Sequence, residues 1–193
     1  MSGVGSRDST RCMAHTSHSN PLHIASVAAR EGLVGMTFCP GKKQRGSALG
    51  FDWDRQLDID ISALQSWQTA VVVTLNEAWE LEQLGVPNLG GALVAAGIEW
   101  HHMPIVDGGV PDAAFERAWQ IVSPDLHSRL TVGERVVVHC KGGLGRTGTI
   151  AARLLIETGI APETAMALVR KARPGAIEND AQEAYVRRAF AVR

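Results

Sequence analysis

The chain has 193 residues, of which 45% are hydrophobic and 20% are charged, and its formal net charge is −1 at pH 7. This composition predicts one globular domain over 21–193, and the near-neutral charge argues against a nucleic-acid partner. No apolar run approaches the about 18 residues that a membrane span needs, and no N-terminal run resembles a secretory signal. Three cysteines without a paired spacing do not build a disulfide framework, so we expect a cytoplasmic protein, and a monomer.

The predicted elements alternate between strand and helix. Residues 1–20 are Ser, Thr, Gly and His in no periodic order, and we expect them to form a flexible leader. Strands are predicted over 35–38, 49–51, 69–75, 99–105 and 135–140. Helices are predicted over 61–67, 78–84, 89–96, 112–130, 147–157, 162–172 and 180–191. The alternation predicts an α/β fold, a three-layer sandwich around a central mixed, partly parallel sheet.

The strand predicted over 135–140 ends in a cysteine, and a glycine-rich loop follows it. The loop closes on an arginine, so that Cys140 and Arg146 have the spacing C-x5-R. Backbone N–H groups of such a loop, and of the helix N-terminus after it, can surround a phosphate. The glycines at 142, 143 and 145 would allow the unusual backbone dihedrals that this cradle requires. The expected phosphate-binding residues are Lys141, Gly142, Gly143, Leu144, Gly145 and Arg146.

Three residues of this segment carry the expected chemistry. Thiols at helix N-termini ionise more readily than free thiols, so Cys140 should attack phosphorus as a thiolate. The planar fork of Arg146 matches two phosphate oxygens, which a lysine would not do. Thr147 can donate its hydroxyl to the departing sulfur, and it also suits a helix cap; the two roles can coexist. Together these residues predict hydrolysis through a phosphocysteine intermediate.

The leaving group needs a proton, and the expected donor is Asp107. It follows a predicted strand and precedes Gly108 and Gly109, in a loop that could close over the site. A positioned carboxylic acid typically contributes about 10²–10⁴-fold to the rate. Asp112 competes for the role, but it precedes a predicted helix and we interpret it as the N-cap.

The same loop is also compatible with other patterns. Residues 143–148 also fit the G-x-G-x-x-G pattern of dinucleotide-binding domains. Only helical sequence follows, so no βαβ unit can be completed, and the acidic residue that binds ribose is absent. A Walker A loop is excluded because Cys140 replaces its first glycine and Arg146 replaces its lysine. A plain strand–helix turn with a buried cysteine would leave the glycines and Arg146 unexplained.

The segment 139–148 resembles the phosphate-binding loop of the protein tyrosine and dual-specificity phosphatase superfamily. Over about residues 36–190 the chain is similar to the kinase-associated phosphatases of the cyclin-dependent kinase inhibitor type. The motifs that carry this likeness are Val86-Pro87-Asn88-Leu89, His101-His102-Met103-Pro104-Ile105, Asp107-Gly108-Gly109-Val110-Pro111-Asp112 and Gly175-Ala176-Ile177.

The resemblance implies that Cys140 is the nucleophile, Arg146 the phosphate clamp and Asp107 the general acid. It also implies that His139 braces the loop. Gln182 lies where related enzymes carry a glutamine that orients the hydrolytic water, although it could equally be a solvated helix residue. Lys141 follows the cysteine as in some phosphoinositide phosphatases and in mitotic-exit phosphatases, which leaves the substrate class open.

No metal and no cofactor are expected. His101 and His102 are adjacent on a predicted strand and therefore face opposite sides, and no other spacing suggests a metal site. Lys42 and Lys43 are interpreted as part of a solvated loop.

The sequence thus predicts a cysteine-dependent protein phosphatase acting on phosphotyrosine and on phosphoserine or phosphothreonine. Its expected partner is a phosphorylated protein, with no membrane partner. The alternatives are a phosphoinositide phosphatase, a phosphate-binding interaction module without turnover, and a thiol enzyme of another type such as an arsenate reductase.

Overall fold

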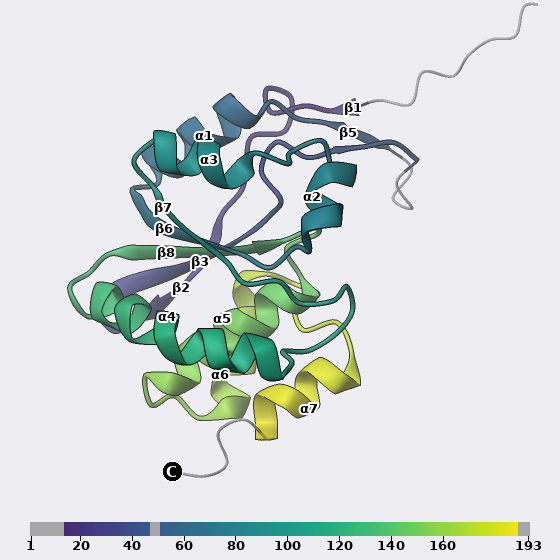
Figure 1. Ribbon diagram of the computed structural model, residues 1–193. Helices are drawn as coiled ribbons and strands as arrows, with labels where there is room; N and C mark the ends of the chain where they lie inside the picture. The colour runs from purple at the N-terminus through teal and green to yellow at the C-terminus, as the bar shows by residue number, and fades with distance from the viewer. Residues whose placement is uncertain (1–13, 47–50, 189–193) are drawn as a thin grey trace, which may run out of the picture.

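The computed structural model describes residues 14–46 and 51–188, which form a central sheet between two layers of helices (Figure 1). The five strands of the sheet are β2 (Ala25–Ala29), β3 (Gly32–Phe38), β6 (Thr69–Thr74), β7 (Glu99–His102) and β8 (Arg135–Cys140). Their order is β2-β3-β8-β6-β7. β2 is antiparallel to β3 and every other pair is parallel, so the sheet is mixed, as predicted.

Helices cover both faces of this sheet (Figure 1). One face carries α1 (Leu57–Ser66), α2 (Ala78–Gln83) and α3 (Leu89–Ala95). The other carries α4 (Ala113–Thr131), α5 (Gly145–Glu157) and α6 (Pro162–Ala172), with α7 (Asp180–Arg188) packed on α5 and α6. The predicted three-layer α/β sandwich is therefore confirmed.

Strand β8 lies in the middle of the sheet and is buried on both faces. Val136 and Val138 belong to the apolar core under α4, α5 and α6, whereas Val137 belongs to the core under α1, α2 and α3. A strand covered by helices on both sides needs apolar residues without alternation, which explains the run of three valines. This central strand carries Cys140 to the carboxyl edge of the sheet.

A second, small sheet lies beside the first and was not fully predicted. It consists of β1 (Ala14–His15), β5 (Asp52–Asp54) and β4 (Lys43–Gln44), in the order β1-β5-β4. The strand predicted over 49–51 falls partly on residues 49 and 50, which lie outside the described residues, and the observed strand begins at Asp52.

Strand β2 has no counterpart among the predicted strands. Its sequence, Ala-Ser-Val-Ala-Ala, holds a single β-branched residue, so its β-propensity is weak. The strand forms because Arg30, with a φ of 53°, closes a tight turn that folds β2 back onto β3. Pairing with β3, and not local β-propensity, therefore determines that this segment forms a strand.

The flexible leader expected over 1–20 is corrected for its last residues, whereas residues 1–13 lie outside the described part of the chain. β1 pairs with β5, and Ser17 is 2% exposed. The Ser17 hydroxyl donates to the Gln56 carbonyl at 3.2 Å, and the Asn20 carbonyl accepts from Arg55 Nη1 at 2.7 Å. These contacts fix residues 14–20 on the domain, which composition alone could not indicate.

Several predicted boundaries also move. α1 begins at Leu57 rather than at residue 61, and α5 begins at Gly145 rather than at residue 147. β7 ends at His102 rather than at residue 105, shortly before Pro104, which has no N–H to pair. The last helix is predicted to end at residue 191, which lies outside the described residues. Within the described residues, α7 extends to Arg188.

Candidate active site

The site is built where β8 ends and α5 begins. Phe38 of β3 pairs with Cys140 of β8, so the cysteine is fixed by the middle of the sheet. The Cys140 residue is 4% exposed, and its Sγ accepts a hydrogen bond from the Gly143 N–H at 3.2 Å. Residues 141–144 then form the loop, and the first N–H groups of α5 lie next to it. Sequence order alone places a sulfur and a helix N-terminus together here.

The three glycines of the loop have different reasons to be glycine. Gly143 has a φ of +72°, and a Cβ built on it would lie 2.3 Å from the Thr37 carbonyl oxygen. A Cβ on Gly145 would lie 2.3 Å from Glu178 Oε2. Gly142 has no positive φ, and no heavy atom lies within 4 Å of its ideal Cβ position. The expectation of unusual dihedrals is therefore confirmed for Gly143 and wrong for Gly142 and Gly145, which have no positive φ.

Arg146 is 2% exposed and its guanidinium is fixed from several elements. Its Nη1 donates to Glu80 Oε2 at 2.6 Å, and its Nη2 donates to Glu80 Oε1 at 2.9 Å. Nη1 also donates to the Ile105 carbonyl at 2.9 Å. A bidentate pair of this kind is geometrically specific, so Arg146 has one defined orientation.

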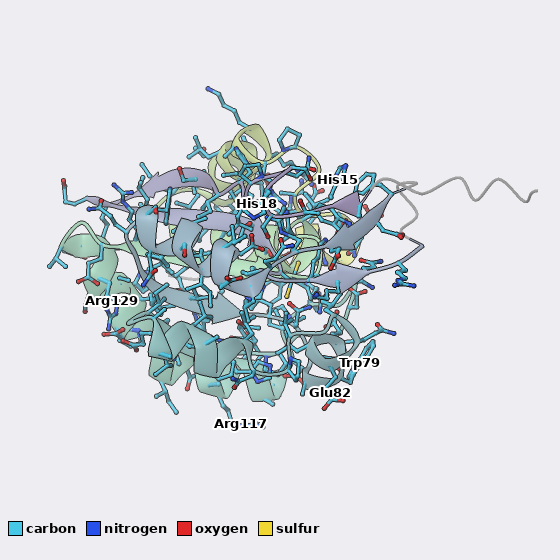
Figure 2. The ribbon with its side chains drawn as sticks, turned by 90° about the horizontal axis from the view of Figure 1, so that it is seen from above. His15, His18, Trp79, Glu82, Arg117 and Arg129 are labelled. Atoms are coloured by element: carbon cyan, nitrogen blue, oxygen red, sulfur yellow. The ribbon has the colours of Figure 1, made fainter. Side chains whose placement is uncertain are left out.

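Glu80 is the functional residue that the sequence did not reveal. It lies on α2 with 2% exposure, whereas Trp79 is 54% exposed and lies with Glu82 on the outer side of the helix (Figure 2). Burial alone would raise the pKa of Glu80, but its hydrogen bonds with Arg146 and Glu77 hold that pKa below the ordinary value. Burial would lower the pKa of Arg146, yet its bonds with Glu80 raise it above the ordinary value. Both groups are therefore charged at neutral pH.

Asp107 reaches the same guanidinium from the loop after β7. Its Oδ1 accepts from Arg146 Nη2 at 2.8 Å, and its side chain is 58% exposed. Asp112 lies at the N-terminus of α4, where its Oδ1 accepts from the Phe115 N–H at 2.8 Å. The structure thus puts Asp107 beside Arg146 and Asp112 at the helix cap, as the sequence predicts.

One cavity of about 370 Å³ collects these side chains. Cys140, Arg146 and Asp107 line it together with Lys141 and Gly142. A neighbouring cavity of about 730 Å³ shares Gln44, Trp53 and Lys141 with it, so the two cavities are adjacent and together are called the groove.

Lys42 also lines the smaller cavity, and its assignment to a solvated loop is wrong because the residue is 4% exposed. A lysine in a short loop is normally solvated. Lys42 is an exception because the small sheet, through Trp53, covers its side chain.

His139 is fully buried behind the loop. Its Nε2 lies 2.7 Å from Thr74 Oγ1, which also accepts from Trp100 Nε1 at 2.8 Å. Burial lowers the pKa of His139 to about 3, so the ring is neutral at pH 7. A neutral, tightly held imidazole fits the bracing role that the family resemblance implies.

Thr147 and Gln182 are both buried. The Thr147 hydroxyl has no hydrogen-bond partner among the described residues, and Leu144, rather than Thr147, is the N-cap of α5. The helix-cap interpretation of Thr147 is therefore wrong. Gln182 donates to the Gly109 carbonyl at 3.2 Å, and its Oε1 accepts from the Glu178 N–H at 2.9 Å. This excludes the solvated alternative for Gln182 and places it between Gly145 and the Asp107 loop.

Arg173, which was not predicted, fixes the loop from its outer side. Its Nη2 donates to the Gly142 carbonyl at 3.0 Å, and its Nε donates to the Gly143 carbonyl. Carbonyls held in this way point away from the centre of the loop, which leaves the N–H groups for an anion. Burial lowers the pKa of Arg173, while the nearby Cys140 opposes that shift.

Among the described residues, Glu99, His101 and Asp125 have side-chain atoms close enough together to hold a metal ion. The guanidinium of Arg129 already contacts both carboxylates, and it lies at the opposite end of the molecule from His15 and Trp79 (Figure 2). This group is remote from Cys140. Glu99 is the first residue of β7, whereas Cys140 is the last residue of β8, and the strands β7, β6 and β8 run parallel. No described helix is both long and apolar enough to cross a membrane.

Comparisons with known proteins agree with this geometry. Residues 16–166, which include Asp107, Cys140 and Arg146, match the model of the cyclin-dependent kinase inhibitor 3 family. Cyclin-dependent kinase inhibitor 3 of Rattus norvegicus is 33% identical over 169 residues, which cover 86% of this chain and 74% of that protein. The Homo sapiens protein of the same name is 31% identical over 173 residues, covering 86% and 77%.

Solved structures give the same result. A kinase-associated phosphatase with its catalytic-site cysteine replaced by serine has a TM-score of 0.75 and 30% identity, covering 86% of this chain and 93% of that one. The active form of Tk-PTP has a TM-score of 0.64 and 26% identity, covering 86% and 95%.

Proposed function

The chain belongs to the cyclin-dependent kinase inhibitor 3 family and has the fold of cysteine-dependent tyrosine and dual-specificity phosphatases, and from this premise we propose that it is a protein phosphatase. It hydrolyses phosphotyrosine and phosphoserine or phosphothreonine in proteins, through a phosphocysteine intermediate. No metal or cofactor takes part in this mechanism.

One observation carries the proposal: three residues from separate segments line a single cavity. Cys140 comes from the end of β8, Arg146 from α5 and Asp107 from the loop after β7. Arg146 Nη2 and Asp107 Oδ1 are 2.8 Å apart, so the clamp and the acid act on the same small volume. A nucleophile, an anion clamp and a proton donor in one cavity are what phosphoryl transfer to a protein side chain requires.

The first step transfers the phosphoryl group to sulfur. The Cys140 thiolate forms the S–P bond while the bond from phosphorus to the substrate oxygen breaks. Asp107, in its protonated form, donates its proton to that leaving oxygen. Arg146 and the loop N–H groups hold the three equatorial oxygens.

The second step returns the enzyme to its starting state. Water attacks phosphorus, the S–P bond breaks, and Asp107 takes the proton from the water. The buried hydroxyl of Thr147 donates a hydrogen bond to the leaving sulfur. Gln182, which touches the Asp107 loop through the Gly109 carbonyl, orients the attacking water. Inorganic phosphate then leaves the cavity.

The shape of the site favours more than one phosphorylated residue. The Asp107 side chain is 58% exposed, so the acid lies at the molecular surface rather than at the bottom of a deep channel. Phosphoserine and phosphothreonine are shorter than phosphotyrosine and need such a shallow site to reach Cys140. The described loops around the cavity are short, which leaves no long segment to wall a deep aryl pocket.

The test is hydrolysis of an aryl phosphate and of phosphotyrosyl and phosphothreonyl peptides by the purified protein. Cys140→Ser should abolish turnover and retain phosphate-ester binding, because a hydroxyl is not ionised at neutral pH. Cys39→Ala, which changes a buried cysteine outside the cavity, is the matched control and should retain turnover. Binding without any turnover by the unaltered protein would instead assign a phosphate-binding interaction module.

A phosphoinositide phosphatase is the second candidate, and the position of Lys141 favours it. Lys141 lines both parts of the groove beside the loop, where it could contact a further phosphate of a headgroup. Rates on phosphoinositides and on phosphopeptides decide between the two. A phosphoinositide rate well above both peptide rates, selectively reduced by Lys141→Ala, would replace the protein substrate by a lipid.

A further inference from the structure

Lys42 is a buried cation at the active site that no sequence motif identifies. The residue is 4% exposed and lines the same cavity as Cys140. Its Nζ donates to the Lys141 carbonyl at 3.2 Å. The same ammonium lies 3.9 Å from the ring centre of Trp53 and 4.9 Å from that of Phe38. No carboxylate within the described residues forms an ion pair with it.

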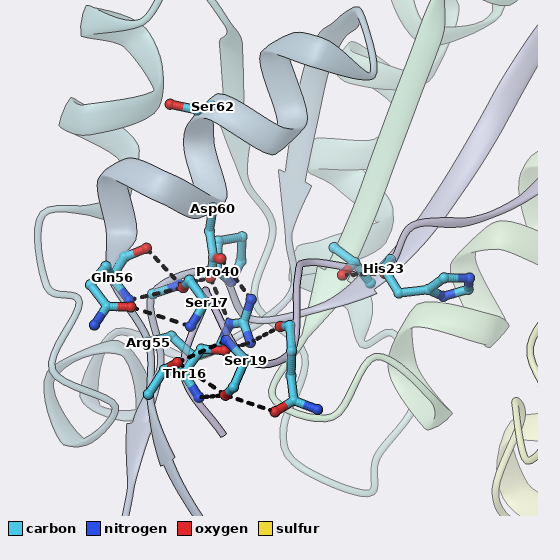
Figure 3. Close-up of polar contacts among 12 residues, drawn as sticks. Thr16, Ser17, Ser19, His23, Pro40, Arg55, Gln56, Asp60 and Ser62 are labelled. Carbon is cyan, nitrogen blue, oxygen red and sulfur yellow. Dashed lines mark hydrogen bonds and ion pairs between the residues drawn. The ribbon is translucent and has the colours of Figure 1, made fainter. Parts of the chain in front are cut away.

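The backbone around Lys42 is held by a buried ion pair. Arg55 and Asp60 are both fully buried, and the guanidinium donates from Nε and Nη2 to the two carboxylate oxygens at 2.8 and 2.7 Å. Asp60 Oδ2 also accepts from the Gly41 N–H at 2.8 Å, and the Arg55 N–H donates to the Lys42 carbonyl at 3.3 Å. Figure 3 shows Arg55 and Asp60 close together, beside the polar contacts of Ser17 and Gln56. Lys42 is therefore placed by a built structure and not by a loose loop.

A buried ammonium without an anionic partner is energetically unfavourable. Burial lowers the pKa of Lys42 to about 8, against the opposing influence of Cys39 and Cys140. Arg55 and Lys141 also face it, and as cations they lower that pKa further. Of the carboxylates at the site, Glu80 and Asp107 pair with Arg146, whereas Glu178 lines the cavity and forms no ion pair with Lys42. A negative charge beside this ammonium would therefore be supplied by the Cys140 sulfur or by an anion bound in the cavity.

We propose that Lys42 is a positioning residue of this active site, one that holds the Lys141 carbonyl outside the phosphate cradle and supplies positive charge to the Cys140 sulfur and the bound phosphate. The part that concerns phosphate rests on the proposed function. The carbonyl at the start of the loop is turned toward Lys42 and toward the Cys39 N–H, which lies 3.4 Å from it. Together with Arg173 on later carbonyls, this leaves the loop N–H groups for the anion.

A purely packing role is the opposing explanation, and methionine distinguishes the two. Lys42→Met keeps an unbranched apolar stem between Trp53 and Phe38 and removes the charge and the N–H donors. Lys42→Gln removes the charge and keeps an N–H donor, on a side chain that is one atom shorter and carries an added carbonyl. Lys43→Met is the matched control, because the neighbouring Lys43 is exposed and pairs with Asp54 at the surface. All three variants change the net charge by the same amount.

The experiment measures alkylation of Cys140 by neutral iodoacetamide as a function of pH, with the labelled Cys140 peptide quantified by mass spectrometry. It is repeated with inorganic phosphate, whose protection of Cys140 gives its affinity. We expect the alkylation midpoint to rise by about 0.5–1 pH unit in Lys42→Met and Lys42→Gln, because a nearby cation stabilises a thiolate. The affinity for inorganic phosphate, measured by its protection of Cys140, should fall about three- to tenfold in both variants. Lys43→Met should have the same midpoint and the same affinity as the unaltered protein.

The outcomes separate this inference from the proposed function, since alkylation requires no turnover. An unchanged midpoint and unchanged protection in folded Lys42→Met, checked by its melting temperature, would overturn the role of Lys42 even if the protein hydrolyses phosphate esters. A raised midpoint in a protein that hydrolyses none would support Lys42 and reject the phosphatase. If Lys42→Met does not fold, Lys42→Gln gives the same decision.

Discussion

Asp107 and Arg146 form an ion pair at the cavity, with Asp107 Oδ1 2.8 Å from Arg146 Nη2. Glu80 holds the guanidinium from its other side, and Nε of Arg146 has no hydrogen-bond partner among the described residues. Nε and Nη2 are the edge that an incoming phosphate would use. Asp107, the proposed general acid, therefore occupies part of the proposed phosphate clamp, and we expect a phosphate ester to displace it there.

Asp107→Asn should consequently have opposite effects on turnover and on anion binding. Loss of the acid should lower kcat about 10²–10⁴-fold, with a smaller loss for substrates that have very good leaving groups. Loss of the carboxylate charge should tighten inhibition by phosphate about two- to fivefold, since an exposed ion pair contributes little. Steady-state kinetics with phosphate as inhibitor measure both quantities.

The control for that variant is Asp112→Asn, which changes the helix cap of α4. Asparagine caps helices well, so stability should fall by less than about 1 kcal/mol and turnover should hardly change. Loss of the acid-dependent step in Asp112→Asn, with Asp107→Asn unaffected, would transfer the general-acid role to Asp112.

Glu80→Gln tests the clamp behind Arg146. Removing one partner of a buried pair costs up to about 3–5 kcal/mol of stability, and here it leaves the buried guanidinium with only the exposed Asp107 as a counter-charge. The misplaced guanidinium should raise KM for phosphate esters as well. Glu82→Gln is the control, because Glu82 is exposed on the outer side of the same helix (Figure 2). Equal unfolding midpoints of the two variants in urea would show that the Glu80 pair is unimportant.

The same pair gives a pH dependence with a defined sign. The folded-state pKa of Glu80 lies below its ordinary value of 4.5, so its stabilisation is complete above that pH. The stabilisation is lost as pH falls below 4.5 and through the folded-state value. Unfolding of Glu80→Gln should therefore depend less on pH in this acid range than unfolding of the unaltered protein.

The sequence predicts those parts of the candidate site whose residues are close together in the chain. Cys140, Arg146 and Thr147 belong to one contiguous motif, and β8 has the predicted bounds because its valines are buried on both faces. The assignment of Asp112 to a helix cap, made from its place before a predicted helix, is confirmed. The helix-cap assignment of Thr147 fails because α5 begins two residues earlier, at Gly145.

The residues that sequence reasoning missed are charged side chains that only tertiary structure buries or half-buries. Glu80, Lys42 and Arg173 come from a helix, a loop and a helix end, where such residues are normally solvated. Glu80 and Lys42 are buried and Arg173 is half-buried, and each meets a specific partner far along the chain: the Arg146 guanidinium, the Lys141 carbonyl or the Gly142 carbonyl. No periodicity or spacing in one sequence encodes these pairings.

The charge of Lys42 predicts how phosphate affinity depends on pH. Its pKa is lowered to about 8 by burial, so the ammonium is present below that pH and lost above it. Phosphate should bind the unaltered protein more tightly than Lys42→Met at pH 6.5, and the two affinities should converge near pH 9.5. Each is read from protection of Cys140 against alkylation. A ratio that stays constant from pH 6.5 to pH 9.5 would be incompatible with titration of Lys42 in this range.

Two adjacent glycines of the loop should respond very differently to alanine. Gly143 has a φ of +72°, a region that costs an L-residue roughly 1–2 kcal/mol, and its added Cβ would lie 2.3 Å from the Thr37 carbonyl oxygen. That oxygen belongs to the backbone of β3 and cannot move aside easily, so Gly143→Ala should distort the loop and destroy the Gly143 N–H bond to the Cys140 sulfur. Gly142 has open space at the same point, so Gly142→Ala should keep turnover within a few-fold and change the unfolding midpoint little. Paired turnover and urea-unfolding measurements on the two variants decide the matter, and similar losses in both would mean that chain flexibility, rather than the conformation at Gly143, is what the loop requires.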